Sequence, residues 1–247
     1  PPQAKFEYRG QLRDWLREGD VILKPISGGF GKGVLHLAAS PTALLEGRTK
    51  KNLFFRKSYP SVEEMLNSLI PRLTARYLIQ RYLSLTTEDG APFDIRIFMQ
   101  KDEEGVWRKI GQGVRIGEPY HLTSNLHGGG RTMTLQAFQR LYRGRIPEGM
   151  EEELSRIGDE VATTLERKYA PLFEIGLDMG VDHDHHLWIL EANGKPGREL
   201  FRQMGDMTGM KTARLGPIRY ALYLEKKGVK RNGILPHENH PFMGENR

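Results

Sequence analysis

The stretch from Gly176 to Gly197, GLDMGVDHDHHLWILEANGKPG, predicts two short strands joined by a polar turn. Residues 187–190 form an apolar run, which is typical of a buried strand. The turn falls at residues 182–186, so the chain reverses there. Folding the hairpin back brings Asp178 opposite Glu191, or one position away from it. These two carboxylates therefore meet at one end of a buried hairpin.

A third oxygen-bearing side chain joins them. Glu191 and Asn193 are two positions apart, so on a strand they point to the same face. Carboxylate and amide oxygens suit a hard cation such as Mg²⁺, which proteins usually share with substrate phosphates. The spacing alone leaves open that Glu191 and Asn193 simply end a strand. The turn sequence DHDHH at 182–186 also invites a metal interpretation, but residues that alternate on a loop tip favour a solvated turn.

Length and composition narrow the class of protein. The chain has 247 residues, enough for one large domain or two closely packed lobes. It contains no cysteine, which excludes disulfides, thiolate metal sites and a cysteine nucleophile, and which fits a reducing compartment. No apolar run approaches the length of a membrane span, and the N-terminus lacks the apolar region of a signal peptide. We therefore expect no membrane partner.

The charge balance raises the question of nucleic acid. The net charge is +6, yet lysine and arginine are scattered rather than gathered in a tract. Small anionic ligands explain such scattered basic residues equally well. Aromatic and basic residues are not interleaved, and the carboxylates of Asp178 and Glu191 would repel phosphate unless a metal is present. We therefore expect no nucleic-acid partner, and this class remains the weaker alternative.

A glycine-rich loop lies between two predicted strands near the N-terminus. Residues 21–25 and 34–37 are the strands, and SGGFGKG at 27–33 is the loop. The loop is no Walker A motif, because Gly33 stands where Ser or Thr should follow the lysine and no helix follows. Its backbone N–H groups could approach phosphates closely, with Lys24 as a point charge. The alternative is a solvated hairpin tip with an exposed lysine.

Two arginines are predicted on neighbouring strands in the middle of the chain. The segment 93–100 alternates, and 106–116 is its return strand, which carries Arg115. Ile95, Ile97 and Met99 face one way, and Asp94, Arg96 and Phe98 face the other. Two arginines beside an aspartate more often form an anion site or an ion pair than a surface patch. The polar, glycine-rich segment 124–130 follows, for which a long turn is the alternative.

The remaining segments supply the frame. Strands are predicted at 52–57 and 77–83, and helices at 11–18, 62–73, 147–168 and 197–226. Ser61 is the expected N-cap of the second helix, with Glu64 in the capping-box position. The buried candidates of the last helix are Phe201, Met204, Ile218, Ala221 and Leu222. The stretch from Lys227 onward is expected to be a polar tail.

A set of short pieces occurs in chain order between about residue 21 and residue 197. The pieces are Leu23-Lys-Pro25, Gly28-Gly-Phe-Gly-Lys-Gly33, Gln80-Arg-Tyr-Leu83, Asp94-Ile-Arg96, Arg115, Ser124-Asn-Leu-His-Gly-Gly129, Gly176-Leu-Asp178, Leu190-Glu-Ala-Asn193 and Pro196-Gly197. In this order the set resembles an ATP-grasp enzyme. The piece Ser124-Asn-Leu-His-Gly-Gly129 is similar to the corresponding segment of the ribosomal-protein glutamate ligases. The first piece, Leu23-Lys-Pro25, and the last segment, Asn193-Gly-Lys-Pro-Gly-Arg198, are similar to the endospore-coat-associated ATP-grasp proteins.

The resemblance implies an α+β fold whose two lobes, with mainly antiparallel sheets, hold ATP between them. Residues 1–82 would be the small lobe, 83–228 the large lobe, and 229–247 a C-terminal tail. The implied nucleotide-binding residues are Lys24, Gly28, Gly29, Gly31, Lys32, Gln80, Arg81, Tyr82 and Leu83. The implied ligands of Mg²⁺, or alternatively Mn²⁺, are Asp178, Glu191 and Asn193. Arg96, Arg115 and Asn125 would steady an acyl-phosphate.

The implied reaction is ligation of a carboxylate to an amine through an acyl-phosphate, at the expense of ATP. The implied substrates are small-molecule or peptide acids and amines, and an oligomer is compatible with the family. Such enzymes usually carry an earlier phosphate-binding lysine, for which Lys5 is the nearest candidate, and an N-terminal domain, which we expect to be missing here. The alternative is an ATP-binding module that does not ligate and serves in coat assembly. The implied location is the cytoplasm, with the spore coat as the alternative.

Overall fold

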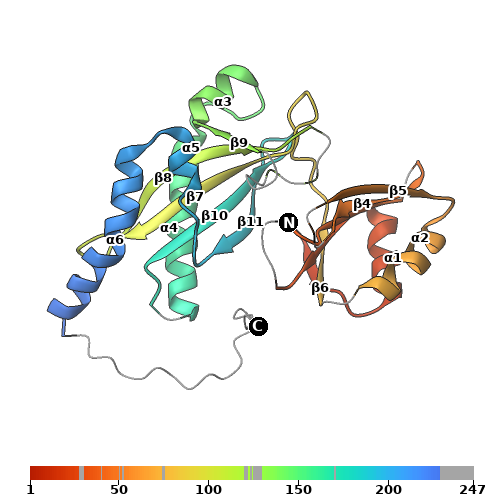
Figure 1. Ribbon diagram of the computed structural model, residues 1–247, viewed down its shortest axis with the longest axis horizontal. Coiled ribbons are helices and arrows are strands. Elements are labelled where there is room, and N and C mark those ends of the chain that lie inside the picture. The colour runs from red at the N-terminus through yellow and green to blue at the C-terminus, as the bar shows by residue number, and fades with distance from the viewer. Residues whose placement is uncertain are drawn as a thin grey trace.

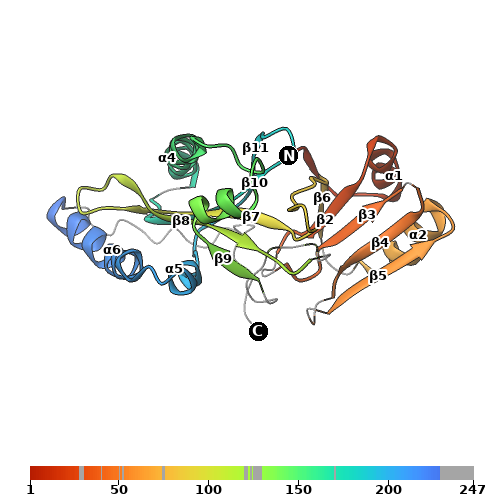
Figure 2. The same cartoon turned by 90° about the horizontal axis from the view of Figure 1, so that it is seen from above.

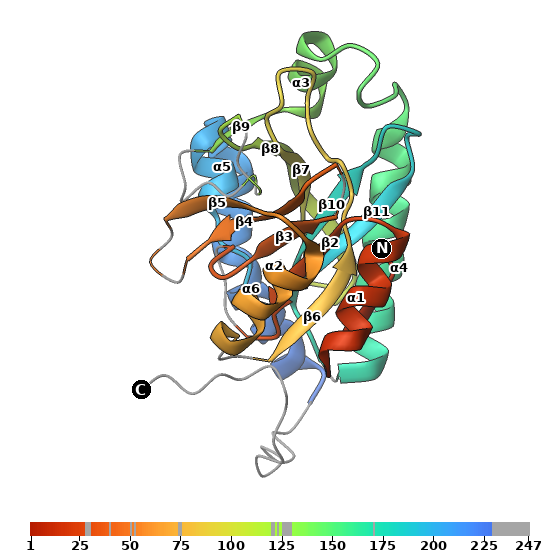
Figure 3. The same cartoon turned by 90° about the vertical axis from the view of Figure 1, so that its right-hand side faces the viewer.

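The computed structural model describes residues 1–27, 31–39, 41–49, 51, 53–73, 76–119, 122, 124, 130–169 and 171–228. These residues form two antiparallel sheets, each with its own helices, which lie side by side as two lobes (Figure 1). In Figure 3, which looks from the side of the first lobe, that lobe stands in front of the second. The expected α+β fold with mainly antiparallel sheets is confirmed. Within the described part of the chain, no helix has the length and apolar character that crossing a bilayer requires.

The first lobe contains a six-stranded sheet in the order β1-β6-β2-β3-β4-β5. Its strands are β1 (Gln3–Lys5), β2 (Val21–Pro25), β3 (Leu35–Ala38), β4 (Ala43–Arg48), β5 (Phe54–Tyr59) and β6 (Tyr77–Arg81). Its helices are α1 (Arg9–Glu18), α2 (Val62–Leu69) and the short 3-10 helix η1 (Ile70–Arg72). Ser61 caps α2 as expected, because its hydroxyl accepts a hydrogen bond from the N–H of Glu64 at 3.2 Å.

One face of this sheet is covered by its helices and the other is left for the site. Val21 and Leu23 of β2 pack with Leu12 of α1 and Leu66 of α2 in one core. Side chains alternate along a strand, so Lys24 points to the opposite face of the sheet. The alternation within β2 therefore fixes which side of the first lobe carries the predicted phosphate-binding lysine.

The second lobe contains a five-stranded sheet in the order β11-β10-β7-β8-β9. Its strands are β7 (Phe93–Lys101), β8 (Trp107–Ile116), β9 (Arg131–Met133), β10 (Glu174–Val181) and β11 (Leu187–Asn193). Its helices are α3 (Leu135–Leu141), α4 (Met150–Tyr169), α5 (Glu199–Met204) and α6 (Met207–Lys226). Figure 2 shows α4 on one side of this sheet and α5 and α6 on the other.

The two faces of β7 differ along their length. Ile95, Ile97 and Met99 belong to the core under α3 and α4, whereas Phe98 packs with Phe201, Met210 and Ala213 of α5 and α6, as the alternation predicted. On β8, a Cβ at Gly113 would lie 2.7 Å from Leu200, so glycine there lets α5 approach the sheet closely. The helices α5 and α6 therefore cover only one end of this face, and the other end carries Asp94 and Arg96.

The segment between the lobes is fastened to the second lobe by Arg145, which is buried. Its guanidinium donates hydrogen bonds to the carbonyl oxygens of Thr86 at 2.9 Å, Asp182 at 2.7 Å, Val181 at 2.8 Å and Ser84 at 3.4 Å. Burial lowers the pKa of Arg145, and the charge of Asp182 acts in the opposite direction. One buried side chain thus joins the segment after β6 to the turn between β10 and β11.

Parts of the expected frame are wrong at the C-terminal end. The helix predicted over 197–226 is two helices, because Gly205 adopts a left-handed conformation at φ 68° and Asp206 caps α6. This break changes the buried stripe of the second helix to Met210, Ala213, Gly216 and Tyr220. The expected core residues Ile218 and Leu222 are 60% and 52% exposed, and Ala221 is also exposed. Phe201 is fully buried as predicted, and Met204 is half-buried.

Candidate active site

The hairpin that is predicted to bind a metal has the expected register. In the pairing of β10 with β11, Asp178 lies opposite Glu191 and Gly176 lies opposite Asn193. Paired residues of an antiparallel ladder point to the same face, so the two carboxylates share one face of the sheet. The register slips between Asp178 and Met179, and such bulges commonly re-aim a side chain beside an active site. Asp178 is buried, whereas solvent reaches Glu191.

Both predicted arginines reach Asp178 across the sheet. Arg96, opposite Asp178 on β7, holds it in a fork: Nε donates to Oδ1, and Nη2 donates to Oδ2 at 2.8 Å. Arg115 on β8 places Nη2 at 2.9 Å from the same Oδ2. The arginines expected to act on a substrate are thus paired with the aspartate expected to bind metal.

Asp94 completes this group, although the sequence analysis gave it no role of its own. Arg115 lies opposite Asp94 and donates from Nε to Oδ1 at 2.6 Å and from Nη2 to Oδ2. The four side chains Asp94, Arg96, Arg115 and Asp178 are each between 9% and 11% exposed. The alternation of Asp94 and Arg96 on one strand was the signal that could have identified Asp94 as part of the site.

Lys24 brings the first lobe to the same group. It is half-buried on β2, and its pKa is lowered by burial, against which the charges of Glu191, Asp178 and Asp94 act in that order. Lost hydration, and then the charge of Asp178, raise the pKa of Glu191, while Lys24 and the two arginines oppose that rise. Three carboxylates and three cationic side chains from both lobes therefore share one electrostatic environment.

The buried members of the group depend on their partners for their charge. Burial alone would raise the pKa of Asp178, but Arg115 and Arg96 lower it below its usual range. Burial alone would lower the pKa of Arg115, but Asp94 and Asp178 raise it. Each of these two side chains is thus stabilised in its charged form by its partners. With Lys24 and Glu191 added, the formal charges of this group, +3 and −3, cancel.

The glycine-rich loop lies only partly in the described part of the chain. Gly31 and Gly33 have positive φ angles of 70° and 75°, which glycine adopts without strain. The N–H of Gly33 donates to the carbonyl of Arg48 at 3.0 Å, so this end of the loop is tied to β4. Lys32 is exposed. Gly28, Gly29 and the predicted Asn125 lie outside the described residues.

The predicted adenine-binding segment has less free backbone than expected. The N–H of Arg81 donates to Pro2 O and the N–H of Tyr82 donates to Asp20 O, each at 3.0 Å. The guanidinium of Arg81 turns to α1, where it donates to Trp15 O and Glu18 at 2.9 Å each. The side chain of Gln80 is buried, and within the described residues the N–H of Leu83 donates to no backbone carbonyl.

The ring of Tyr82 stacks on His36 with 4.2 Å between ring centroids. Each nitrogen of His36 faces a carboxylate: Nδ1 lies 2.9 Å from Glu46 and Nε2 lies 3.2 Å from Asp20. The hydrogen bond from His36 lowers the pKa of Glu46. This polar cluster was not predicted from the sequence, because its members come from four separate segments of the first lobe.

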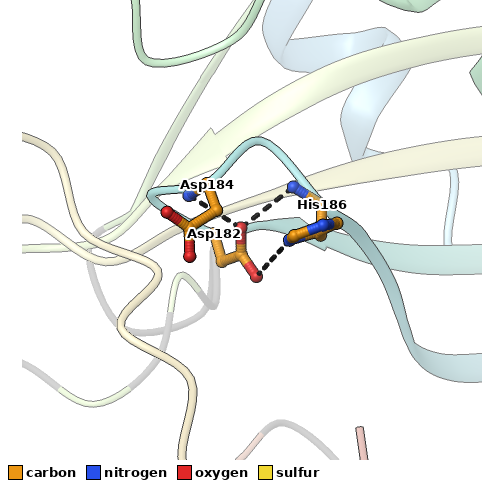
Figure 4. A group of neighbouring side chains, drawn as sticks. All are labelled: Asp182, Asp184 and His186. Carbon is orange, nitrogen blue, oxygen red and sulfur yellow. Dashed lines mark hydrogen bonds and ion pairs between the residues drawn. The ribbon is translucent and has the colours of Figure 1, made fainter.

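The turn at 182–186 satisfies its own polar groups (Figure 4). Ligand atoms of Asp182, Asp184 and His186 lie within 4.8 Å of one another. However, Asp182 Oδ1 accepts from the N–H groups of Asp184 at 3.0 Å and His186 at 2.9 Å. Its Oδ2 accepts from the indole of Trp188 at 2.7 Å. Both oxygens of Asp182 therefore stabilise the turn, which favours the solvated-turn interpretation.

Two α+β lobes that bring a lysine, two arginines and three carboxylates together define an ATP-grasp domain. A profile of the YheC/D-like ATP-grasp family matches residues 1–224, and the chain belongs to this family. The resemblance predicted from the sequence is thereby confirmed.

Two curated proteins of Bacillus subtilis (strain 168) are similar to the chain. The endospore coat-associated protein YheC is 29% identical over 97% of this chain and 66% of its own length. The endospore coat-associated protein YheD is 24% identical over 85% of this chain and 46% of its own length. The chain thus spans less than two thirds of either relative.

Among solved structures, the ATP-grasp ligase PsnB, in a complex with a precursor peptide and AMPPNP, is 16% identical with a TM-score of 0.48. That match covers 92% of this chain and 54% of PsnB. An ADP complex of the N5-carboxyaminoimidazole ribonucleotide synthetase PurK is 16% identical with a TM-score of 0.47, over 80% of this chain and 41% of PurK.

Proposed function

We propose that this chain is an ATP-dependent carboxylate–amine ligase that forms an amide through an acyl-phosphate. The observation that carries the proposal is the neutral group of three cations and three carboxylates to which both lobes contribute. The carboxylates of the group offer oxygen ligands to a metal cation, and its cationic side chains offer contacts to a polyphosphate, so both can bind there together. ATP with Mg²⁺ presents both partners, and membership of an ATP-grasp family agrees with this.

In this proposal the first lobe binds the nucleotide. Lys24 would bind phosphate as a point charge, and the backbone N–H groups of the glycine-rich loop, for which Gly28, Gly29, Gly31 and Lys32 are the predicted residues, would contact the phosphates. The segment Gln80–Leu83 lines the base pocket. Because the N–H groups of Arg81 and Tyr82 are already paired, the N–H of Leu83, which lies beyond the end of β6, is the backbone donor left for the base edge.

The second lobe would hold the metal. Asp178, Glu191 and Asn193 offer oxygen donors of the kind that Mg²⁺ prefers, and Mn²⁺ accepts the same set. The raised pKa of Glu191, to which Asp178 contributes, indicates two carboxylates that a divalent cation would stabilise. The donors therefore fit the cation, which when bound would draw charge from the phosphates.

The arginines would act on the reacting groups. Arg115 and Arg96 have planar forks that match a carboxylate or phosphate, and they lie on the face that Lys24 approaches. Positive groups fixed where phosphoryl charge develops lower the barrier without reorganising. Asn125 would contact the reacting groups together with these two arginines. The substrates would be small-molecule or peptide acids and amines, and residues 1–82 and 83–228 would be the two lobes.

The test is ADP release by the purified chain with ATP, Mg²⁺ and a panel of acids and amines. ADP release should require both an acid and an amine. Glu191→Gln should lower it by at least about 100-fold, because the shape of the side chain stays and one charge is lost. The matched control is Asp184→Asn, at the other end of the same hairpin, which should leave it unchanged. Nucleotide binding without ADP release for any pair would assign the alternative, an ATP-binding module that does not ligate.

The relatives' names concern the endospore coat. We propose that this chain works in the cytoplasm, with association with the spore coat as the alternative. A fluorescent fusion followed through sporulation checks this. Fluorescence that never concentrates at the coat would remove the coat from the proposal while leaving the ligase reaction untouched.

A further inference from the structure

The two arginines of the site are held differently. Arg115 has a carboxylate of its own, because Asp94 takes its Nε and Nη2, and it reaches Asp178 only with Nη2. Arg96 has Asp178 alone: within the described part of the chain, no other carboxylate pairs with it. If Asp178 were taken from this group, Arg115 would keep its two hydrogen bonds to Asp94, whereas Arg96 would have no carboxylate partner.

The same asymmetry holds for the two oxygens of Asp178. Oδ2 is shared by Nη2 of Arg96 at 2.8 Å and Nη2 of Arg115 at 2.9 Å. Oδ1 accepts only from Nε of Arg96, among the residues that the structure describes. A cation that takes Oδ1 therefore competes with Arg96 and leaves the hydrogen bonds of Arg115 in place.

We propose that Arg96 is a releasable arginine, which the metal displaces from Asp178, and that Asp94 is a positioning residue that keeps Arg115 fixed meanwhile. This inference rests on the proposed function, because it takes Asp178 as a metal ligand. When metal and nucleotide bind together, the guanidinium of Arg96 would leave Asp178 and become free to bind a substrate. Before loading, the fork is closed on Asp178 and cannot bind a substrate carboxylate or phosphate. The site thereby becomes ready for its acid only after metal and nucleotide are in place.

The first test observes the two Nε–H groups directly by NMR of ¹⁵N-labelled arginine, without turnover. Addition of Mg²⁺ with a non-hydrolysable ATP analogue should shift the Nε signal of Arg96 and speed its hydrogen exchange. The Arg115 signal should keep its protection. Release of Arg115 in place of Arg96, or of neither, would overturn the inference. Signals are assigned with Arg96→Lys and Arg115→Lys.

The second test uses the same two variants, because both conserve charge. Lysine cannot form a fork, so Arg96→Lys should bind Mn²⁺ at least about threefold more tightly in the presence of the analogue. Arg115→Lys should change Mn²⁺ affinity less, since its fork is on Asp94. Equal effects in the two variants would contradict different roles.

A third variant tests Asp94 itself. In Asp94→Ala, Arg115 loses the acceptor of its Nε–H and keeps only the contact of Nη2 with Asp178, so its Nε–H protection should be lost both before and after loading. Protection that persists would show that Asp94 does not position Arg115. A wild-type protein that binds neither Mn²⁺ nor the analogue would instead refute the proposed function, and so the two failures are distinguishable.

Discussion

Strand β10 carries two buried carboxylates on one face, Glu174 and Asp178, and their pKa values shift in opposite directions. Asp178 faces two arginines, which lower its pKa. Glu174 faces Arg198 at 2.8 Å and the amide of Gln100 at 3.2 Å, yet burial outweighs them and raises its pKa. The amide of Gln100 and the guanidinium of Arg198 also donate to the carbonyl of Ala213 in α6.

The difference shows how one strand serves two purposes. At Glu174 the polar groups fasten α6 to the sheet and are closed off by that helix. At Asp178 no helix of the described chain covers the face, and Lys24 comes from the other lobe instead. A carboxylate whose partners bind a helix is structural, whereas one whose partners face a second lobe is available to a ligand. Four changes, from the largest expected effect to the smallest, test this contrast.

Arg198→Met should destabilise the end of β10 at which Glu174 and its partners fasten α6. It leaves Glu174 buried without its cation, which should cost about 3 kcal/mol of unfolding free energy. Urea unfolding measures this. Replacing Glu174 by Met as well should recover much of the loss, because an apolar pair of similar volume leaves no buried charge. Nucleotide affinity of the folded fraction should stay unchanged; a large fall there would show that the two ends are not independent.

Lys24→Ala should impair the site around Asp178, to which the first lobe contributes this lysine. The loss of one charge-assisted contact should weaken ATP binding by about 1.5–3 kcal/mol, while the unfolding free energy changes little. Calorimetric titration with ATP and Mg²⁺ gives the affinity. Lys211→Ala, on the exposed face of α6, is the control and should bind normally. Unchanged ATP affinity in Lys24→Ala would refute its phosphate-binding role.

Arg115→Lys should separate turnover from binding. It keeps the charge and loses the planar fork, so kcat should fall at least about tenfold, or about 1.4 kcal/mol. ATP affinity should fall much less, because this arginine is assigned to the reacting groups. Steady-state kinetics and calorimetry on one preparation decide the matter. The reverse pattern, in which turnover survives and ATP affinity collapses, would make the assignment wrong.

Glu174→Gln should reduce the pH dependence of the unfolding free energy that arises from the buried carboxylate of Glu174. Because the folded-state pKa of Glu174 is raised, the folded protein binds more protons than the unfolded chain just above pH 4.3 or so. Stability should therefore fall as pH rises through that window, by at most about 1.4 kcal/mol per pH unit. Urea unfolding across pH 4–7 should show this slope in the wild type and less of it in Glu174→Gln. An identical slope in both would exclude Glu174 as its source.

The local parts of the fold could be read from the sequence. The bounds of β2 are those predicted, and Asp178 does pair with Glu191, because alternation and a polar turn fix the register of a hairpin. Strand β4 was missed, since Leu44 and Leu45 interrupt its alternation. Helix α3 was missed because it has only seven residues.

The site could be predicted only as a set of residues and not as a set of contacts. The pattern placed Asp94 and Arg96 on one face, but could not choose which carboxylate each arginine takes, because that depends on the order of strands β10, β7 and β8. The cluster around His36 could not be predicted for the same reason: its four segments of sequence meet only after the sheet forms.

The anchoring by Arg145 has a mechanical consequence. Tyr82 is bound to the first lobe through Asp20 and His36, while the carbonyl of Ser84 is bound to Arg145 in the second. Leu85 also packs on Gly180, where a Cβ would lie 2.6 Å from it. Leu83 is the single residue between the last tie to the first lobe, at Tyr82, and the first tie to the second lobe, at Ser84. The lobes are therefore joined by a swivel one residue long, which permits rotation about a nearly fixed point and resists sliding.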